Sequence, residues 1–250
     1  MQHNVPAMKK IATLAAGASL LGLPALAPAA DTVSPVVIEL FTSQGCSSCP
    51  PADAYLGELA RQPGIIALAF HVDYWDYIGW KDPLAFPQAT ARQRGYTQAL
   101  GTRYLYTPEM VIDGREDTAG TDRTTVSRLI RSERAAAPKL PLSVRERPEE
   151  KYTIDIPAAD FHGTATVWMA VFDREHTTAV ERGENGGRSL RDYNAVRELR
   201  KLGSWSGKAV QIPVDMALAP MNGCAILLQA DRQPGDGQGP ILGATLVKED

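Results

Sequence analysis

An apolar run that leads directly into two closely spaced cysteines constrains the fold of this chain more than any other feature. Residues 36–41 (VVIELF) form the short apolar run typical of a buried strand, and the motif CSSC follows at residues 46–49. Apolar residues then recur at helical spacing as far as Ala60, behind two consecutive prolines that fit only near the start of a helix. Residues 65–72 are a second continuous apolar run. The segment therefore predicts a β-α-β unit with the cysteines between its first strand and its helix.

The next part of the chain completes a seven-element pattern. Residues 84–100 are predicted to form a helix, and residues 109–112 form a short strand. Asp113-Gly114 is a strong hairpin signal, which makes residues 115–119 a returning antiparallel strand. Asp122 is a suitable cap for a last helix. The predicted order is β-α-β-α-β-β-α, with a mixed parallel and antiparallel sheet.

The character of the sequence changes at residue 138. Three prolines among charged residues between 138 and 148 are typical of a linker. Strand-like patterns then dominate, at residues 152–156, 164–172, 210–214, 224–230 and 241–247. Residues 191–202 also allow a helix, and their irregular pattern leaves that choice open. We predict an α/β domain with a mixed sheet over residues 30–137 and a smaller β-rich, sandwich-like domain over residues 138–250.

The first 29 residues have the pattern of a signal peptide. Lys9 and Lys10 precede an apolar stretch over residues 11–26, and Ala27-Pro28-Ala29 is an A-x-A cleavage site. No later segment has the roughly 18 continuous apolar residues that a membrane-spanning helix needs. We therefore expect a periplasmic or secreted protein with no transmembrane segment after signal removal. An uncleaved signal anchor is the alternative.

Charge and motif content exclude several classes of function. The chain has 26 basic and 29 acidic residues, a formal net charge of −3 and no basic cluster, so no nucleic acid partner is expected. It contains no Walker loop, dinucleotide fingerprint, G-x-S-x-G elbow or H-E-x-x-H motif. Nucleotide-dependent enzymes and the common hydrolases are therefore disfavoured, and no cofactor is expected.

The two cysteines of the motif are better explained by chemistry than by stability. A disulfide between Cys46 and Cys49 closes a very small loop, so its effect on chain entropy is modest. At the start of a helix, Cys46 meets backbone N–H groups that favour its thiolate, the attacking species in disulfide exchange. Cys49, one turn further on, is placed to resolve the mixed disulfide. The third cysteine, Cys224, lies in an apolar strand pattern where a buried, inert thiol is expected.

These elements together resemble a known fold. The β-α-β-α-β-β-α order, the CSSC loop after the first strand and Thr107-Pro108 before the third strand resemble the thioredoxin-like superfamily. Residues 41–53 (FTSQGCSSCPPAD), 71–76 (HVDYWD) and 106–108 (YTP) are more specifically similar to a family of exported bacterial thioredoxin-like proteins catalogued as a domain of unknown function. The resemblance extends to residues 187–190 and 194–197 of the second predicted domain.

The resemblance implies roles for several residues. Pro108 should be a cis proline that faces the cysteines, and Thr107 and Pro108 should orient a partner strand. Thioredoxins keep a buried acid on the first strand as a proton acceptor, and Glu39 is the candidate here, although it lies one residue further from the first cysteine. A Glu39 that points outward is the alternative. The chain departs from thioredoxins at Gly45, where they carry an aromatic residue, and at the Ser47-Ser48 pair, where they carry Gly-Pro.

Polar and aromatic residues follow the second predicted strand, at the edge of the sheet where ligands gather in open α/β folds. His71, Asp73, Trp75 and Asp76 are candidates for a substrate groove beside the cysteines. Packing in the core or between domains is the alternative for these residues. A soft metal site made of the two cysteines and His71 lacks a fourth ligand, so no metal is predicted.

Two functions of different classes fit the sequence. The first is an exported thiol–disulfide oxidoreductase in which Cys46 attacks a protein or small thiol substrate and Cys49 resolves, with a redox partner that the sequence does not identify. The second is a secreted, non-enzymatic module that binds a partner protein or a soft metal and uses the disulfide for structure.

Overall fold

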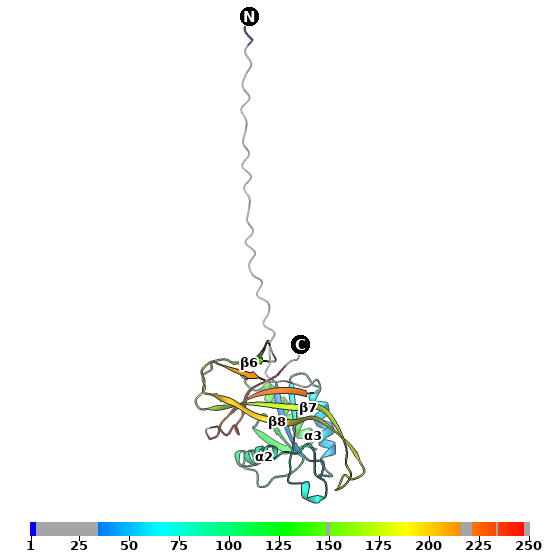
Figure 1. Ribbon diagram of the computed structural model, residues 1–250. Coiled ribbons are helices and arrows are strands. Elements are labelled where there is room, and N and C mark those ends of the chain that lie inside the picture. Colours follow the sequence, from blue (N-terminus) through cyan, green and yellow to red (C-terminus); the bar gives the residue numbers. More distant parts are fainter. Residues whose placement is uncertain (4–34, 149–150, 216–221, 234, 248–250) are drawn as a thin grey trace. The chain divides into compact units, whose positions relative to one another are not determined.

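The computed structural model describes residues 1–3, 35–148, 151–215, 222–233 and 235–247 (Figure 1). Apart from its first three residues, the predicted signal peptide lies outside the described residues. The chain separates into Met1–Asp31 and Thr32–Asp250, and the fold below is that of the second part. Among the described residues, no helix is long and apolar enough to cross a membrane.

The first half of the fold has the predicted β-α-β-α-β-β-α order, interrupted only by a short 3-10 helix, η1. Its elements are β1 (Val36–Thr42), α1 (Pro50–Ala60), β2 (Ile65–His71), η1 (Asp76–Ile78), α2 (Pro87–Leu100), β3 (Glu109–Ile112), β4 (Glu116–Ala119) and α3 (Arg123–Ala135). The elements described after them are strands: β5 (Ser143–Arg147), β6 (Lys151–Ile156), β7 (Ala165–Ala179), β8 (Ser189–Trp205), β9 (Val210–Asp215), β10 (Asn222–Ala230) and β11 (Ile241–Leu246).

The helix that the sequence allowed over residues 191–202 does not form, because this segment belongs to β8. β7 and β8 make a long antiparallel hairpin that pairs residues from Ala179 with Ser189 to Ala165 with Trp205, and Figure 1 shows the two strands side by side. The register shifts at two points along the hairpin. Each shift disturbs the alternation of inward and outward side chains, which explains why the sequence pattern is irregular.

One eight-stranded mixed sheet contains strands from both predicted domains. Its order is β11-β10-β7-β8-β2-β1-β3-β4. β1 and β2 are parallel, as the β-α-β unit requires, and β3 runs antiparallel to β1. β2 joins β8 in parallel at a single register pair, Ala69 with Ala195. The large sheet therefore contains strands from both sides of residue 138. The boundary that the sequence places there between two domains stays a prediction.

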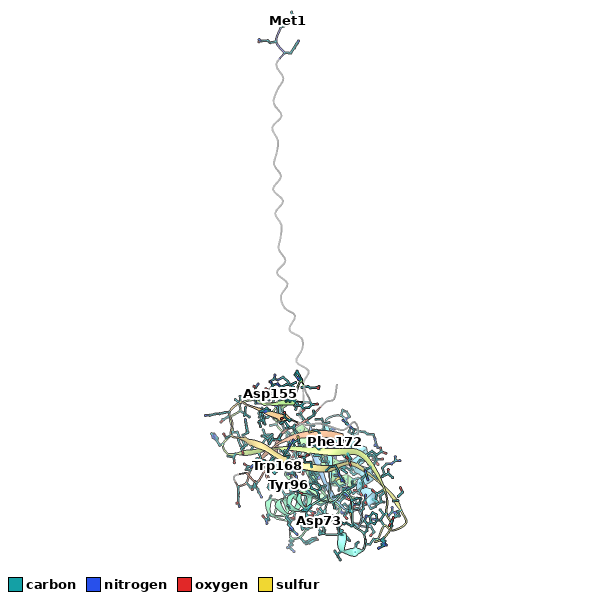
Figure 2. The ribbon with its side chains drawn as sticks, in the orientation of Figure 1. Met1, Asp73, Tyr96, Asp155, Trp168 and Phe172 are labelled. Atoms are coloured by element: carbon teal, nitrogen blue, oxygen red, sulfur yellow. A yellow bond between two sulfur atoms is a disulfide. The ribbon has the colours of Figure 1, made fainter. Side chains whose placement is uncertain are left out.

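Side chains of β1 alternate between two helical layers. Ile38 and Leu40 belong to the apolar cluster that contains residues of α1 and α3. Val37 and Phe41 belong to the cluster on the other face, which contains residues of α2 and of the later strands. Tyr96 of α2 and two β7 residues, Trp168 and Phe172, contribute to this second cluster (Figure 2). Both faces of the central strands are therefore covered, and their polar residues are buried with them.

A separate antiparallel sheet, with the order β5-β6-β9, covers part of the large sheet. Ile154 of β6 and Val214 of β9 share an apolar cluster with Val167 of β7 and Ile226 of β10. This arrangement of two facing layers is sandwich-like, as predicted for the second half.

Candidate functional site

Cys46 and Cys49 form a disulfide between the end of β1 and the start of α1, with their Cα atoms 5.5 Å apart. Cys49 is the residue that precedes α1, and its N–H donates to the carbonyl oxygen of Cys46. Cys46 is 1% exposed and Cys49 is 0% exposed, whereas Ser47 and Ser48 between them are exposed. The loop therefore presents its serines to solvent and buries both sulfurs.

The first turn of α1 offers few amide donors to Cys46. Pro50 and Pro51 occupy the first two helical positions and have no N–H, while the N–H groups of Ala52 and Asp53 donate to the carbonyl oxygen of Cys49. The stabilisation of a thiolate by helix amides, expected from the sequence, is correspondingly reduced. The Ser48 hydroxyl lies 3.2 Å from Cys46 Sγ and can donate to a thiolate there.

Thr107 lies against the first cysteine, and its peptide bond with Pro108 is cis, as the resemblance implies. Cys46 Sγ is 3.8 Å from the carbonyl oxygen of Thr107. The Trp75 indole N–H donates to Thr107 Oγ1 over 2.9 Å. The fold thus brings together Cys46, Cys49, Thr107, Pro108 and Trp75 from the predicted set.

Glu39 lies on the opposite face of β1 from α1. Arg92 of α2 donates to its carboxylate through Nε and, over 2.8 Å, through Nη2. The Tyr96 hydroxyl donates to the same carboxylate over 2.7 Å, and Arg92 Nη2 also donates to Gln229 of β10. Because Glu39 is one residue further from the cysteines than the acid of thioredoxins, strand alternation turns it toward α2. The structure makes it part of a buried ion pair that joins β1, α2 and β10.

A different group of ionisable side chains is buried behind the cysteine loop. His71, at the end of β2, has its Nδ1 2.8 Å from Asp82 and its Nε2 3.8 Å from Asp192 of β8. The Thr42 hydroxyl, opposite His71 in the β1–β2 register, donates to Asp53 over 2.7 Å. Asp53 is in the first turn of α1, four residues after Cys49. We call Asp53, His71, Asp82 and Asp192 the buried acid–histidine cluster.

Burial and mutual charge shift the pKa values of this cluster. Burial, reinforced by the negative charge of Asp192, raises the pKa of Asp53 to about 7. Burial alone lowers the pKa of His71, but the carboxylates of Asp82 and Asp192 outweigh it and raise that pKa to about 9. Burial opposes ionisation of Asp82, yet the His71 imidazolium leaves the pKa of Asp82 below its usual value. At neutral pH His71 is therefore charged, while Asp53 exchanges its proton readily.

The remaining groove candidates, Asp73 and Asp76, bind groups other than the cysteines. Asp73 accepts a hydrogen bond from the Thr90 hydroxyl of α2 over 2.6 Å. Asp76 accepts one from the backbone N–H of Asp82 over 3.2 Å, which closes the turn around η1. Of the four residues predicted as a groove, Trp75 reaches Thr107 and His71 joins the buried acid–histidine cluster.

The tip of the β7–β8 hairpin holds the cysteine loop. The Asn185 side-chain amide donates to the carbonyl oxygens of Gln44 and Cys46, each over 2.9 Å. The Ser47 N–H donates to the Glu184 carboxylate over 3.0 Å. Residues more than 130 positions away in sequence thus complete the site. Cys224 stays in β10, where burial raises the pKa of its thiol to about 12.

Sequence reasoning missed Asp53, Asp82, Asp192 and Asn185. A signal for Asp53 was present, because residues four apart on a helix share one face and Asp53 follows Cys49 at that spacing. Asp192 and Asn185 carry no such signal, since only the hairpin brings them to the loop. Within the described ranges, no three His, Cys, Asp or Glu side chains are grouped so as to hold a metal ion.

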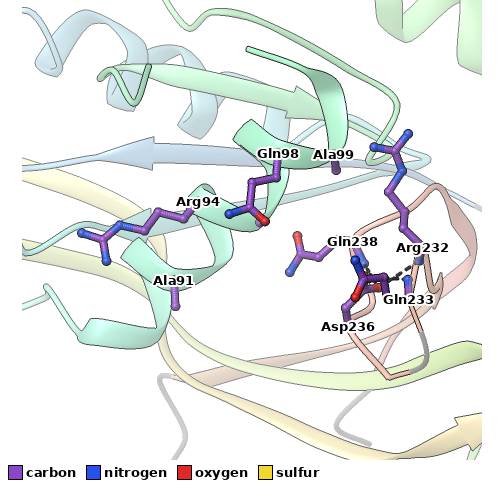
Figure 3. A pocket seen from close by; sticks show the side chains of 9 residues that line it. Ala91, Arg94, Gln98, Ala99, Arg232, Gln233, Asp236 and Gln238 are labelled. Carbon is purple, nitrogen blue, oxygen red and sulfur yellow. Dashed lines mark hydrogen bonds between the residues drawn. The ribbon is translucent and has the colours of Figure 1, made fainter. Parts of the chain in front are cut away.

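A cavity lies elsewhere in the fold. It measures about 660 Å³, and its walls come from α2 and from residues 232, 233, 236 and 238 (Figure 3). Its two arginines, Arg94 and Arg232, point away from each other in Figure 3. None of its lining residues belongs to the cysteine site.

Comparisons with known proteins agree with this fold. Residues 37–229 match the family described as "Protein of unknown function (DUF1223)". A protein from Agrobacterium tumefaciens whose crystal structure is known shares 35% sequence identity with this chain. The two structures match with a TM-score of 0.75 over 87% of this chain and 96% of that chain. HBP35 of Porphyromonas gingivalis shares the thioredoxin-like fold, with 13% identity and a TM-score of 0.57 over 86% of this chain and 74% of that chain. No curated protein matches the chain.

Proposed function

The chain belongs to the DUF1223 family of proteins of unknown function, and we propose that it is an exported thiol–disulfide oxidoreductase. The observation that carries this proposal is the Cys46–Cys49 disulfide at the start of α1, with the Thr107 carbonyl oxygen 3.8 Å from Cys46 Sγ. A carbonyl beside the reactive sulfur supplies a hydrogen-bond acceptor for the backbone of an incoming substrate strand. Protein thiols and small thiols are the proposed substrates.

The proposed reaction is a two-step exchange. A substrate thiolate attacks Cys46 Sγ, the bond between the two cysteines breaks, and Cys49 leaves as a thiolate that takes up a proton. A second substrate thiolate then attacks the substrate sulfur of the mixed disulfide and releases Cys46. Two electrons pass from the substrate dithiol to the protein disulfide, and the reverse steps reduce a substrate disulfide.

Asp53 is the proposed proton carrier for Cys49. Its carboxyl group is buried one helical turn after the cysteine, and its pKa of about 7 suits proton exchange near neutral pH. Glu39 is not assigned this role, because its carboxylate is bound by Arg92 on the other face of β1.

Access to the site depends on the loop that follows β2. A side-chain carbon added to Gly45 would lie 3.2 Å from Trp75 Cβ and 3.5 Å from Ile78 Cδ1, so this loop packs closely beside Cys46. Because Cys46 is buried, a substrate reaches its sulfur only when neighbouring side chains move. Small thiols should therefore exchange faster than bulky ones.

The decisive experiment measures exchange and potential together. The mature protein is equilibrated in glutathione buffers, its thiols are trapped, and mass shifts report the redox state of the pair. A potential above roughly −250 mV with catalytic turnover supports the oxidoreductase. Cys46→Ser should abolish exchange, Cys49→Ser should trap a mixed disulfide, and Cys224→Ser should leave both properties unchanged. Full activity in the Cys46→Ser variant overturns the proposal.

A structural disulfide in a binding module is the second candidate. The burial of both sulfurs favours it, as does the fixation of their loop by Asn185. A potential below about −300 mV without turnover would select this candidate.

Export is a separate part of the proposal and rests on the sequence pattern of residues 1–29. Expression of the full chain in a Gram-negative host, followed by fractionation and N-terminal sequencing, tests it. A mature N-terminus at Ala30 in the periplasm supports export, whereas an intact chain in the cytoplasm contradicts it.

A further inference from the structure

The buried acid–histidine cluster contains a residue that the proposed exchange does not yet use. Asp192 comes from β8, in the half of the chain that thioredoxin-like sequence features do not explain. Its carboxylate accepts a hydrogen bond from Gln44 Nε2 over 2.8 Å, while the Gln44 N–H donates to Asp82 over 2.8 Å. Gln44 is two residues before Cys46, so one residue of the cysteine loop binds both carboxylates.

The buried acid–histidine cluster contains three carboxyl groups but only one imidazole that can neutralise them. Asp53 faces Asp192 from β8, His71 from β2, Asp82 from the segment after η1 and the Thr42 hydroxyl from β1. Asp192 also faces His176 of the neighbouring strand β7. One imidazolium cannot balance three buried carboxylates, and burial without compensation strongly disfavours a charge.

His71 is held in a position from which it does not fully neutralise the carboxylate of Asp192. Its Nδ1 is engaged by Asp82, and its Nε2 is buried with no hydrogen-bond partner among the described residues. Nε2 lies 3.8 Å from Asp192, close enough for attraction but beyond hydrogen-bond distance. The negative charge of Asp192 therefore still acts on Asp53.

We propose that Asp192 is a positioning residue of the redox site: its carboxylate, held by Gln44 and facing His71, makes Asp53 a stronger acceptor for the proton of Cys49. The proposal rests on the oxidoreductase function proposed above. It assigns to the β7–β8 hairpin a part in the proton chemistry of the cysteine pair as well as in holding its loop.

A chromogenic disulfide of thionitrobenzoate separates the two chemical steps. In the first phase the Cys46 thiolate of the reduced protein attacks the reagent, releases one thionitrobenzoate and forms a mixed disulfide. In the second phase the Cys49 thiol gives its proton to the Asp53 carboxylate, and its thiolate attacks Cys46 Sγ. The second thionitrobenzoate leaves, so the two electrons of the protein dithiol reside on two released thionitrobenzoate ions.

The experiment records the second-phase rate against pH. In the unsubstituted protein this rate should rise through an ionisation near pH 7, in line with the pKa of Asp53. Asp192→Asn keeps the size and an oxygen for Gln44 but removes the charge, so the ionisation should move about one unit to lower pH. Asp192→Glu restores the charge and should restore the profile.

A matched control removes a neighbouring charge outside the cluster. Glu175 lies on the same hairpin and pairs with Arg191 over 3.3 Å near the surface. The variant Glu175→Gln removes its charge. Its second-phase profile should match that of the unsubstituted protein. Asp192→Ser is a second neutral variant of different shape, which keeps the test decisive where the Asn variant does not fold.

The outcomes distinguish the two proposals. An absent first phase in the unsubstituted protein contradicts the oxidoreductase function itself. Two other results, each with a normal first phase, overturn the role of Asp192 alone. One is a second-phase rate that shows no ionisation near pH 7 in the unsubstituted protein. The other is a pH profile that stays the same in a folded neutral variant of Asp192.

Discussion

The side-chain amide of Asn185 lies 2.9 Å from the carbonyl oxygen of Cys46 and donates to it from the tip of the β7–β8 hairpin. The same amide donates to the carbonyl oxygen of Gln44. Asn185 is fully buried, so these carbonyl groups have little access to water as a substitute. The position of the first cysteine therefore depends on a residue far away in the sequence.

We predict that Asn185→Ala destabilises the oxidised protein by about 1–3 kcal/mol, because two buried acceptors lose their donor. The variant should also raise the rate at which Cys46 is alkylated after reduction, since its loop is less restrained. Urea unfolding and timed alkylation measure the two effects. Glu184→Gln, which changes an exposed neighbour, serves as the control and should lower stability by less than 1 kcal/mol.

Glu39 should matter for stability and not for proton transfer. Glu39→Gln leaves the buried Arg92 without its carboxylate partner, so we expect a loss of about 3–5 kcal/mol in the free energy of unfolding. The pH dependence of the second thionitrobenzoate phase should stay unchanged. A shifted pH profile with unchanged stability would instead identify Glu39 as a proton carrier.

Gly57 of α1 should not tolerate a methyl group. A Cβ at this position would overlap the ring of Tyr193 on β8. On an exposed helix the change to Ala would stabilise by about 1 kcal/mol, but here overpacking should produce a net loss of about 1–3 kcal/mol. Thermal unfolding of Gly57→Ala measures this loss. In a Tyr193→Ala background the same change should become neutral or stabilising, and an equal loss in both backgrounds would contradict the packing argument.

Stability should fall as pH rises from about 4 to 9. Burial raises the pKa of Asp53 from 3.8 and of Glu109 from 4.5 to about 7, and neighbouring carboxylates raise the pKa of His71 from 6.5 to about 9. Between the unfolded and folded pKa values, the folded state binds more protons, so each rise in pH favours unfolding. The contribution of His71 is complete below pH 6.5 and is lost through pH 9.

Urea unfolding of the oxidised protein at pH 5, 7 and 9 tests this dependence. Each retained proton contributes a slope of about 1.4 kcal/mol per pH unit within its window. Asp53→Asn should flatten the part between pH 4 and 7, because it removes a carboxyl group whose pKa in the folded state is raised to about 7. A free energy of unfolding that increases from pH 5 to 9 would contradict the assigned pKa directions.

The sequence by itself determined the local order of the fold and the place of the cysteines in it. The apolar run of β1, the prolines at the start of α1 and the Asp113-Gly114 turn are short-range signals, and each predicts its own element. Thr107 and Pro108 were identified through the resemblance to thioredoxin-like proteins, which rests partly on this local order. Such signals act within a few residues, so one sequence was enough to place Cys46 and Cys49 between a strand and a helix.

Only the tertiary structure decided which side chains surround the cysteines. Glu39 lies one residue further from the cysteines than the buried acid of thioredoxins, and strand alternation therefore turns it toward α2. Only pairing across the sheet decided that residues 191–202 form a strand. Asp192 and Asn185 reach the site because β8 joins β2 and the hairpin tip folds over the cysteine loop. Contacts between residues more than a hundred positions apart depend on how whole elements pack, and local periodicity carries no information about them.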